Sequence, residues 1–575
     1  MPRVASFLIG CVAALLAAGC STSENATKGG APHGVAATVR TTTFTSLARL
    51  TPTVDVATGI AAPTLIAARG EREGFQLVAW ADRGSPRVVL VTRALTGPNG
   101  ARIAARRVHA MVEQPVTVER GSPAGRRGQY VDALIPAAHR DVVLGPDQRL
   151  LAWIDVEVPV GTAPGTYRGA VELRSSTKSG RHATGAEGLL ARVPVTLVVR
   201  AATLPDRPTL ASSIGVDASQ LIRFEGVKAG SKELRSTVDR YARVLAEARL
   251  SIADVDALPP TGVAGASGPP ADGAYLRRVF DRRGVASVRI PFYMTYPFGD
   301  PLGADRPRAL AYLRGAAAWA RANDLLDRAY VYAIDEPDTA RVGEVRELHE
   351  LVHEADPKLR LLVTRERSAK EFAGVVDIWT PNISAGRFRV ADVVAAKRAG
   401  QSTWWYPSIT TWQPQPSMFI DDVRPAPRAL GWLSWRYGVE GLLYWSATHW
   451  HDVEDPYRDP ATYRETDVVG NGDGVLLYPG APVGQRGVPS RSVRLLELRD
   501  GIEDHDLLTL AACHGTAAER LRLTRIAAVV APSMTSIAPT DAQVAALRDA
   551  AFDTLDRAAA AKRYDAASTK PACAI

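Results

Sequence analysis

The sequence has few cysteines and almost no long apolar stretches. Only four of its 575 residues are cysteine, and their spacing is not that of a zinc site. Beyond the N-terminal segment no run approaches about 18 apolar residues, so we expect no membrane-spanning helix. The formal charge of +8 comes mostly from scattered arginines rather than from a dense basic run, which argues against a nucleic-acid partner. What is left is a globular chain long enough for about three or four domains.

Other common signatures are missing as well. The chain has no glycine-rich phosphate loop with its lysine and no Gly-x-Ser-x-Gly elbow for a nucleophilic serine. We therefore expect no cofactor, and we assign no metal. His449 and His451, close to Asp452, are interpreted as a hydrogen-bonded loop rather than as metal ligands, and residues 471–474 are interpreted as a tight turn.

Residues 1–19 have the features of a bacterial lipoprotein signal peptide. Arg3 precedes an apolar stretch, and small residues lead into Cys20. Cys20 would carry the lipid and anchor the protein to the outer face of the cell membrane. Ala17 stands where such signals most often have leucine, so ordinary cleavage and secretion is the alternative. Residues 20–40 are small and polar, as in a flexible tether.

The two remaining cysteines of the mature chain, Cys513 and Cys573, are a disulfide candidate because the compartment is oxidising. Closing such a loop contributes on the order of 4 kcal/mol in the chain-entropy model. Two unrelated buried thiols are the alternative interpretation.

Residues 41–205 are predicted to form a β-sandwich domain. Apolar and other residues alternate along several stretches, and turn signals separate them. Ile154, Val156 and Val158 form one such alternation, and Val193 to Val199 form another. A proline-containing linker follows at residues 204–208.

Residues 206–488 are predicted to form a (β/α)8 TIM-like barrel, because strand-like and helix-like stretches alternate along them. Residues 489–575 are rich in alanine and leucine with helical spacing, which predicts a short C-terminal α-helical region. The eight expected strands are residues 212–217, 251–256, 287–294, 329–336, 360–365, 375–382, 402–407 and 441–446.

Two adjacent acids, Asp335 and Glu336, end the fourth of these strands. Pro337 biases Glu336 away from the helical region, so we expect extended backbone through both acids. A helix is expected from about residue 342, capped by Asp338 or Thr339. Catalytic groups of barrel enzymes gather at such strand-to-helix junctions. A strand end with a helix cap and no chemistry is the alternative.

The other predicted strand ends carry aromatic and polar residues. Aromatic faces stack on sugar rings, while amides and carboxylates bind their hydroxyls. The set therefore favours a glycan substrate, although any one of these aromatic residues could equally belong to the core. The candidate substrate-binding residues are Tyr293, Asn382, Trp405, Tyr406, Tyr444 and Trp445.

The adjacency of the two acids bears on the mechanism. Glycosidases that use two flanking carboxylates hold them about 5 to 5.5 Å apart when retaining and about 6.5 to 9.5 Å apart when inverting, usually on different strands. Neighbours in sequence fit better the mechanism in which the 2-acetamido group of the substrate is the nucleophile. Glu336 has the longer side chain and is assigned as the general acid/base, and Asp335 as the group that stabilises the acetamido intermediate.

A set of stretches carries a family resemblance: residues 332–337, 431–435, 441–445, 472–480 and 492–504, with 71–78 and 164–169 in the N-terminal region. They resemble glycoside hydrolase family 123 and its relatives in a domain of unknown function. The resemblance covers most of the mature chain, including the expected β-sandwich. It implies an exo-acting, retaining β-N-acetylgalactosaminidase in which Asp335 and Glu336 match the catalytic pair, whereas no galactose-specific contact can be matched.

Two other functions stay open. One is a surface glycan-binding protein that keeps the barrel without turnover. The other is a glycosidase that pairs one acid with a distant aspartate, for which Asp217, Asp256 and Asp377 are candidates. The sequence carries no signal for the oligomeric state.

Overall fold

The computed structural model describes residues 38–176, 188–253, 273–365, 372–465 and 467–570. The predicted signal peptide with Cys20, nearly all of the tether, Asp256 and Cys573 lie outside these ranges. The described residues belong to one compact unit.

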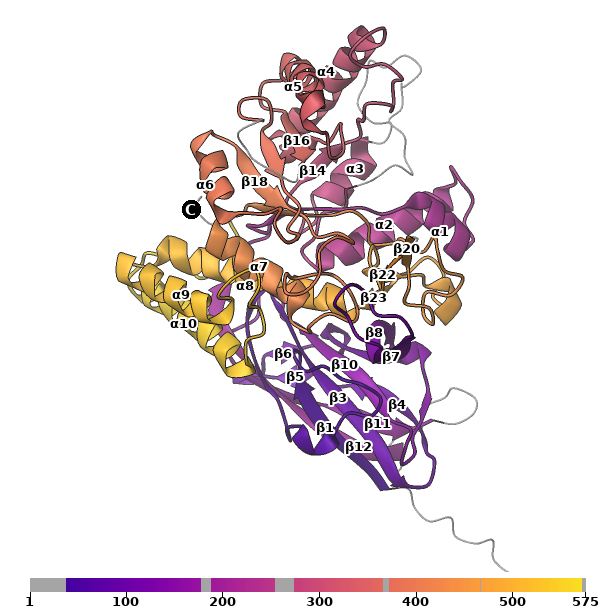
Figure 1. Cartoon of the computed structure of the whole chain (residues 1–575). Helices are drawn as coiled ribbons and strands as arrows, with labels where there is room; N and C mark the ends of the chain where they lie inside the picture. The colour runs from indigo at the N-terminus through magenta and orange to yellow at the C-terminus, as the bar shows by residue number, and fades with distance from the viewer. Residues whose placement is uncertain (1–37, 177–187, 254–272, 366–371, 466, 571–575) are drawn as a thin grey trace, which may run out of the picture. The chain divides into compact units, whose positions relative to one another are not determined.

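The N-terminal region is mostly sheet, as expected (Figure 1). Two sheets contribute side chains to one apolar core, among them Phe75 and Leu77 from one sheet and Val195 and Leu197 from the other. The first sheet has the order β1 (Thr38–Thr45), β3 (Arg72–Arg83), β10 (Leu150–Glu157), β7 (Val108–Val118), β8 (Gly128–Pro136), β23 (Ser490–Ser492), β22 (Leu477–Tyr478). The second has the order β2 (Thr64–Arg69), β12 (Leu189–Thr203), β11 (Gly165–Ser175), β4 (Arg87–Thr92), β9 (Val142–Val143), with β5 (Leu95–Thr96) and β6 (Arg102–Ile103) beside β11.

In the described part of the central region, seven parallel strands form a nearly closed barrel, which fits a TIM-like fold. The strand order is β13 (Ala211–Ile214), β19 (Gly441–Tyr444), β18 (Ser402–Trp405), β17 (Ile378–Thr380), β16 (Arg360–Thr364), β15 (Ala329–Val331), β14 (Val288–Ile290). The helices among them are α1 (Ala218–Glu225), α2 (Lys232–Glu247), α3 (Gly273–Phe280), α4 (Arg306–Ala322), α5 (Val342–Ala355), α6 (Val390–Arg398) and α7 (Ala426–Tyr437), and a hairpin of β20 (Tyr463–Glu465) and β21 (Val468–Gly470) follows.

The eighth expected strand, at residues 251–256, differs from the prediction. In its described part only Ile252 pairs, through a single parallel bridge to Ile214 of β13. Side-chain hydrogen bonds of Ser251 take the place of a backbone β-ladder here. Its hydroxyl oxygen accepts hydrogen bonds from the backbone N–H groups of Ala286 and Ser287 at 3.0 and 3.2 Å. These contacts span the gap between β13 and β14.

Three helices make up the C-terminal region, as predicted: α8 (Val493–His514), α9 (Ala517–Val530) and α10 (Asp541–Ala560) (Figure 1). Helix α8 is buried along nearly its whole length, charged residues included. Arg494 binds Asp132 of β8 through two hydrogen bonds of 2.9 and 2.8 Å, and Arg499 reaches Asp155 of β10 at 2.8 Å. Burying charges this deeply is tolerated only when they are paired, so these ions tie α8 to the first sheet.

Two sequence expectations concern covalent and membrane features. Cys513 is disulfide-bonded, while its expected partner Cys573 lies outside the described residues, so that pairing stays a prediction. Within the ranges that the structure covers, no helix is long and apolar enough to cross a membrane.

Candidate active site

The acid pair lies beyond the carboxyl end of β15, in the turn that leads to α5. The strand ends at Val331, and the backbone bends at Asp335 and Glu336. The expected cap is displaced by one turn: Asp338 accepts the N–H of Arg341 at 3.1 Å and caps a short 3-10 turn, Thr339–Arg341, whereas α5 begins at Val342 after Arg341 without a side-chain cap.

The prediction of extended backbone at Glu336 is wrong. Glu336 has a φ of 38°, in the left-handed region, which costs a non-glycine residue about 1–2 kcal/mol. Pro337 disfavours the right-handed helical region but leaves this one accessible. The N–H of Glu336 donates to the hydroxyl of Thr364 at 3.0 Å, and this contact from the end of β16 helps to hold the bend.

Asp335 is held by two hydroxyl groups. Thr364 donates to Oδ1 of Asp335 at 3.0 Å, and Tyr332 donates to the same oxygen. Burial, and then the Asp335 charge, raise the pKa of Tyr332 well above its ordinary value, so Tyr332 keeps its proton and remains a donor. The carboxylate is therefore fixed in orientation while the residue stays exposed to the cavity.

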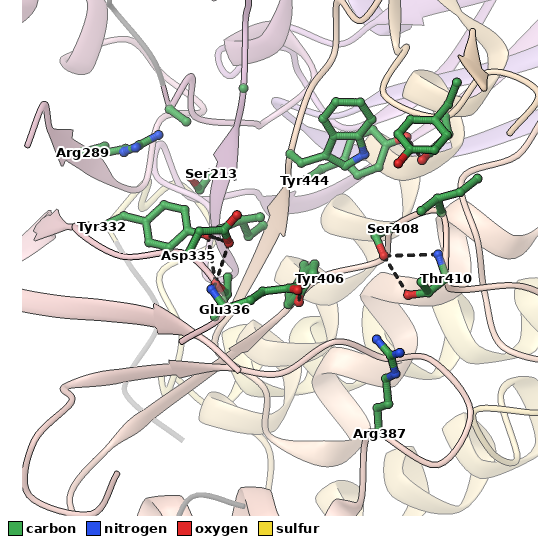
Figure 2. Close-up of a pocket in the computed structure, with 18 of the residues that line it drawn as sticks. Ser213, Arg289, Tyr332, Asp335, Glu336, Arg387, Tyr406, Ser408, Thr410 and Tyr444 are labelled. Atoms are coloured by element: carbon green, nitrogen blue, oxygen red, sulfur yellow. Dashed lines mark hydrogen bonds between the residues drawn. The ribbon is translucent and has the colours of Figure 1, made fainter. Parts of the chain in front are cut away.

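Glu336 has a separate partner. Tyr406, from the loop after β18, donates its hydroxyl hydrogen to Oε1 of Glu336. Burial and, after it, this hydrogen bond raise the pKa of Tyr406 above its ordinary value. Figure 2 shows Tyr332 beside Asp335 and Tyr406 beside Glu336. The two carboxylates thus accept hydrogen bonds from different tyrosines, although Thr364 contacts both residues.

Both acids line a cavity of about 410 Å³, near the lower end of the range of about 300–1,000 Å³ for small-molecule sites. Its wall comes from the carboxyl ends of the barrel strands and the loops after them. The lining residues are Ser213, Gly215, Ala253, Arg289, Tyr293, Tyr332, Asp335, Glu336, Thr364, Arg387, Tyr406, Ser408, Ile409, Thr410, Leu443, Tyr444, Trp445, Tyr463 and Asp473.

Four of the six candidate substrate-binding residues lie on this wall, namely Tyr293, Tyr406, Tyr444 and Trp445. Trp405 does not: it is completely buried and packs against Phe388 and Tyr437 in the core. Strand side chains alternate between faces, so Trp405 points away from the barrel interior that Trp404 and Tyr406 share.

Asn382 lies behind the wall. Its side chain donates to Ser408 at 3.0 Å, and its oxygen accepts the N–H of Ser384 at 2.8 Å. Ser408 in turn hydrogen-bonds Thr410 (Figure 2). Asn382 therefore supports two polar residues of the cavity instead of lining it.

Asp473 is a wall residue that sequence reasoning missed, because residues 471–474 were interpreted only as a turn. Tyr444 donates to its Oδ1 at 3.0 Å. Burial raises the pKa of Asp473 to about 6, against hydrogen bonds from Tyr444 and Trp445 that lower it. Gly472 and Gly474 on either side, both with positive φ, were the available signal of a constrained loop.

Arg289 and Thr364 were missed too. The Arg289 guanidinium lies 4.8 Å from the ring centre of Tyr293 and 5.1 Å from that of Tyr332, within cation–π range. Both residues lie on predicted strands, and no sequence motif marked either of them.

The distant aspartates occupy other positions. Asp217 caps α1 and binds His451 at 2.7 Å. His451 also contacts Gln220 at 3.0 Å, which fits the interpretation of a hydrogen-bonded loop. Asp377 precedes β17, at the amino end of the barrel, and so it lies at the opposite end from the acid pair.

Adjacent carboxylates among aromatic side chains at the carboxyl end of a parallel barrel are the arrangement that the sequence led us to expect for a glycoside hydrolase. The chain belongs to glycoside hydrolase family 123. Residues 308–511 match the catalytic-domain model of that family and residues 55–175 match the model of its N-terminal domain, together more than half of the chain. The resemblance drawn from the sequence is confirmed, and membership supports glycoside hydrolase activity.

A comparison with solved structures bears on the fold. The chain is similar to a family 123 glycoside hydrolase from Clostridium perfringens, with 11% identity and a TM-score of 0.65 over 92% of this chain and 99% of that one. At this identity the likeness shows the fold alone. Two other solved structures are too dissimilar to carry an argument. One is a mutant β-glucuronidase from Bacteroides uniformis, with 11% identity and a TM-score of 0.26 over 72% of this chain and 47% of that one. The other is a GH10 xylanase from Thermobacillus composti, with 11% identity and a TM-score of 0.27 over 51% of this chain and 97% of that one. No curated protein matches the chain.

Proposed function

We propose that this protein removes terminal β-linked N-acetylhexosamine, most specifically β-N-acetylgalactosamine, by a retaining mechanism in which the substrate's acetamido group is the nucleophile. The observation that carries the proposal is the separate support of two adjacent acids: Tyr332 and Thr364 hold Asp335, and Tyr406 holds Glu336. Neighbours in sequence are poorly suited to flank one glycosidic bond, whereas they can serve two parts of one sugar.

In the first step the acetamido oxygen attacks the anomeric carbon while the bond to the leaving oxygen breaks. Glu336 gives its proton to that oxygen. Asp335 accepts a hydrogen bond from the acetamido N–H as the acetamido group becomes part of a positively charged oxazolinium ring. In the second step water attacks the anomeric carbon, Glu336 accepts its proton, and the acetamido group is released. The configuration at the anomeric carbon is retained because both attacks invert it.

The aromatic wall supports a sugar as substrate. Trp445 and Tyr293 provide faces that can stack on a pyranose ring, and Asp473 and Arg289 provide charged groups for its hydroxyls. The solved relative from Clostridium perfringens is described in connection with the hydrolysis of a glycolipid glycan, so such glycans belong in the substrate panel. From the N-terminal sequence we propose that the protein acts outside the cytoplasm, lipid-anchored through Cys20 or secreted.

The test uses chromogenic β-N-acetylgalactosaminide, β-N-acetylglucosaminide and β-galactoside substrates. We expect turnover of the first, inhibition by a thiazoline that mimics the oxazoline intermediate, and no cleavage of the galactoside, which lacks the acetamido group. Cleavage of the galactoside would favour a two-carboxylate mechanism. Binding of glycans without any turnover would favour the non-catalytic alternative.

Variants separate the roles of the two acids. Glu336→Gln should lose more rate on a substrate with an alkyl leaving group than on a 4-nitrophenyl one, since a good leaving group needs less protonation. Asp335→Asn should lose rate on both alike. Asp338→Asn is the matched control, because Asp338 lies in the same loop and caps the following turn. Equal rates for Glu336→Gln and the parent protein on every glycan would refute the assignment.

A further inference from the structure

Two histidines and one aspartate converge at the amino end of the barrel, away from the acid pair. His349 and His353 are four residues apart on α5 and therefore share one face of the helix. Asp377 immediately precedes β17. Nε2 of His353 lies 3.0 Å from Oδ2 of Asp377, and Nε2 of His349 lies 3.6 Å from Oδ1.

The three side chains are close enough together to hold one metal ion. One ligand atom from each of the three residues can be chosen so that all lie within 4.8 Å of one another. Tetrahedral zinc with bonds of about 2.0–2.1 Å places its ligand atoms roughly 3.3 Å apart, between the two measured separations. The two imidazole rings lie 4.0 Å apart between centres, tilted by 32°, and Nε2 of each lies close to the Asp377 carboxylate.

The surroundings support the carboxylate and leave the group accessible. The N–H of Leu361 in β16 donates to Oδ2 of Asp377 at 2.7 Å, a second contact of the kind that orients metal-binding carboxylates. The side chains of His349, His353 and Asp377 are 19%, 30% and 22% exposed. An ion can therefore reach the group from solvent without unfolding of α5.

The ligand types indicate which ion fits. Two imidazole nitrogens with one carboxylate oxygen suit zinc and its neighbours among the transition metals, whereas calcium and magnesium prefer oxygen ligands throughout. Three protein ligands leave a fourth tetrahedral position for water.

We propose that His349, His353 and Asp377 bind a divalent transition metal ion, with Zn²⁺ the preferred one, and that this ion fastens α5 to the amino end of β17. Among the described residues these three are the group that meets the geometry of a metal site. Residues 349–353 have the spacing His-Glu-x-x-His, a metal-binding pattern at odds with the expectation of no metal. Glu350 is exposed, and the proposal concerns binding alone.

The experiment uses the mature chain without an affinity tag, stripped with a chelator and dialysed. Titration with ZnCl₂ by calorimetry should show one high-affinity site, a matching Zn²⁺ content after gel filtration, and a higher melting temperature. Co²⁺ in place of Zn²⁺ should give the visible absorption of a tetrahedral complex. CaCl₂ and MgCl₂ should produce none of these changes.

Substitutions locate the site. His353→Ala and Asp377→Asn should each weaken Zn²⁺ binding at least tenfold; the asparagine variant keeps an acceptor for the Leu361 N–H and guards against simple misfolding, which circular dichroism checks. Glu350→Gln, on the same helix, and His451→Ala, which removes another His–Asp pair, should bind as the parent does. No Zn²⁺ uptake by the parent, or unchanged uptake by both ligand variants, would overturn the proposal. None of these measurements depends on glycoside hydrolysis.

Discussion

The buried ion pair between Arg494 and Asp132 should be among the most sensitive points of the scaffold. The two side chains are 5% and 2% exposed, and both nitrogens of the Arg494 fork bind the two oxygens of Asp132. A third nitrogen of Arg494 donates to the carbonyl of Gly472 at 2.7 Å and to that of Met418. Replacing Arg494 by methionine keeps much of the side-chain bulk while removing all of these contacts.

The expected cost follows from what the substitution leaves behind. Removing one partner of a buried pair leaves the other charge without compensation and costs about 3–5 kcal/mol. The two carbonyl groups that lose their donor add about 1 kcal/mol each if water does not reach them. Tyr478 still donates to Asp132 at 2.6 Å, which offsets part of the loss. We therefore expect Arg494→Met to lower the free energy of unfolding by about 3–5 kcal/mol.

Urea unfolding, followed by tryptophan fluorescence and by circular dichroism, measures this effect. Asp132→Leu together with Arg494→Met should cost much less than the sum of the single changes, because the double variant buries no unpaired charge. Arg40→Met is the matched control: its pair with Asp82 has a similar distance of 2.9 Å but is 61% and 42% exposed, so little change is expected. Additive single effects, or a loss under about 1 kcal/mol for Arg494→Met, would refute the reasoning.

Three further predictions concern two residues of the cavity wall and a pair of tryptophans, one in the core and one on the wall. Burial raises the pKa of Asp473 from 3.8 to about 6, so this carboxyl group loses its proton at a lower pH in the unfolded chain than in the folded one. The free energy of unfolding therefore falls as the pH rises from about 4 to about 6. Over that pH range the free energy of unfolding of Asp473→Asn, measured with urea, should rise relative to the parent by up to about 3 kcal/mol. Thr364→Val should lower kcat by about 10- to 100-fold with little effect on KM, since it removes one hydrogen bond to the Asp335 carboxylate and one from the Glu336 N–H; an unchanged kcat would show that Tyr332 alone positions Asp335. Trp405→Ala should lower the free energy of unfolding by about 3–5 kcal/mol. Trp445→Ala should instead raise KM about tenfold without such a loss of stability. The reverse result would mean that the two tryptophans were assigned to the wrong environments.

The sequence was sufficient to predict most of the barrel, because its strands are short apolar runs separated by helical periodicity. Seven of the eight expected strands are present, and only residues 251–253 fall short of a ladder in the described chain. There the pairing is made by the Ser251 side chain, and hydrophobic pattern carries no information about a hydroxyl that replaces a backbone hydrogen bond.

The site was harder to predict because wall residues depend on which face of a strand they occupy. Trp405 and Tyr406 are neighbours, and a shift of one residue exchanges barrel interior and exterior. Tyr406 faces inward with Trp404, so Trp405 had to face outward. The roles of Asp473 and Arg494 were hard to predict for another reason, because their partners are distant in the sequence. Arg494 binds Asp132 of the first sheet, and Asp473 meets Tyr444 only in the folded barrel.

The stretch from Ser492 to Asp504 shows how a family resemblance and a chemical site can lie on different residues. Its charged side chains are buried and contact the first sheet through Asp132 and Asp155. Arg494 also holds the carbonyl of Gly472, the neighbour of Asp473, whose carboxylate receives the Tyr444 hydroxyl in the cavity wall. A match to this stretch therefore predicts the scaffold and part of the wall, while only Asp335 and Glu336 predict the reaction. A relative that keeps the buried ions and lacks the acid pair should fold in the same way and leave glycans intact.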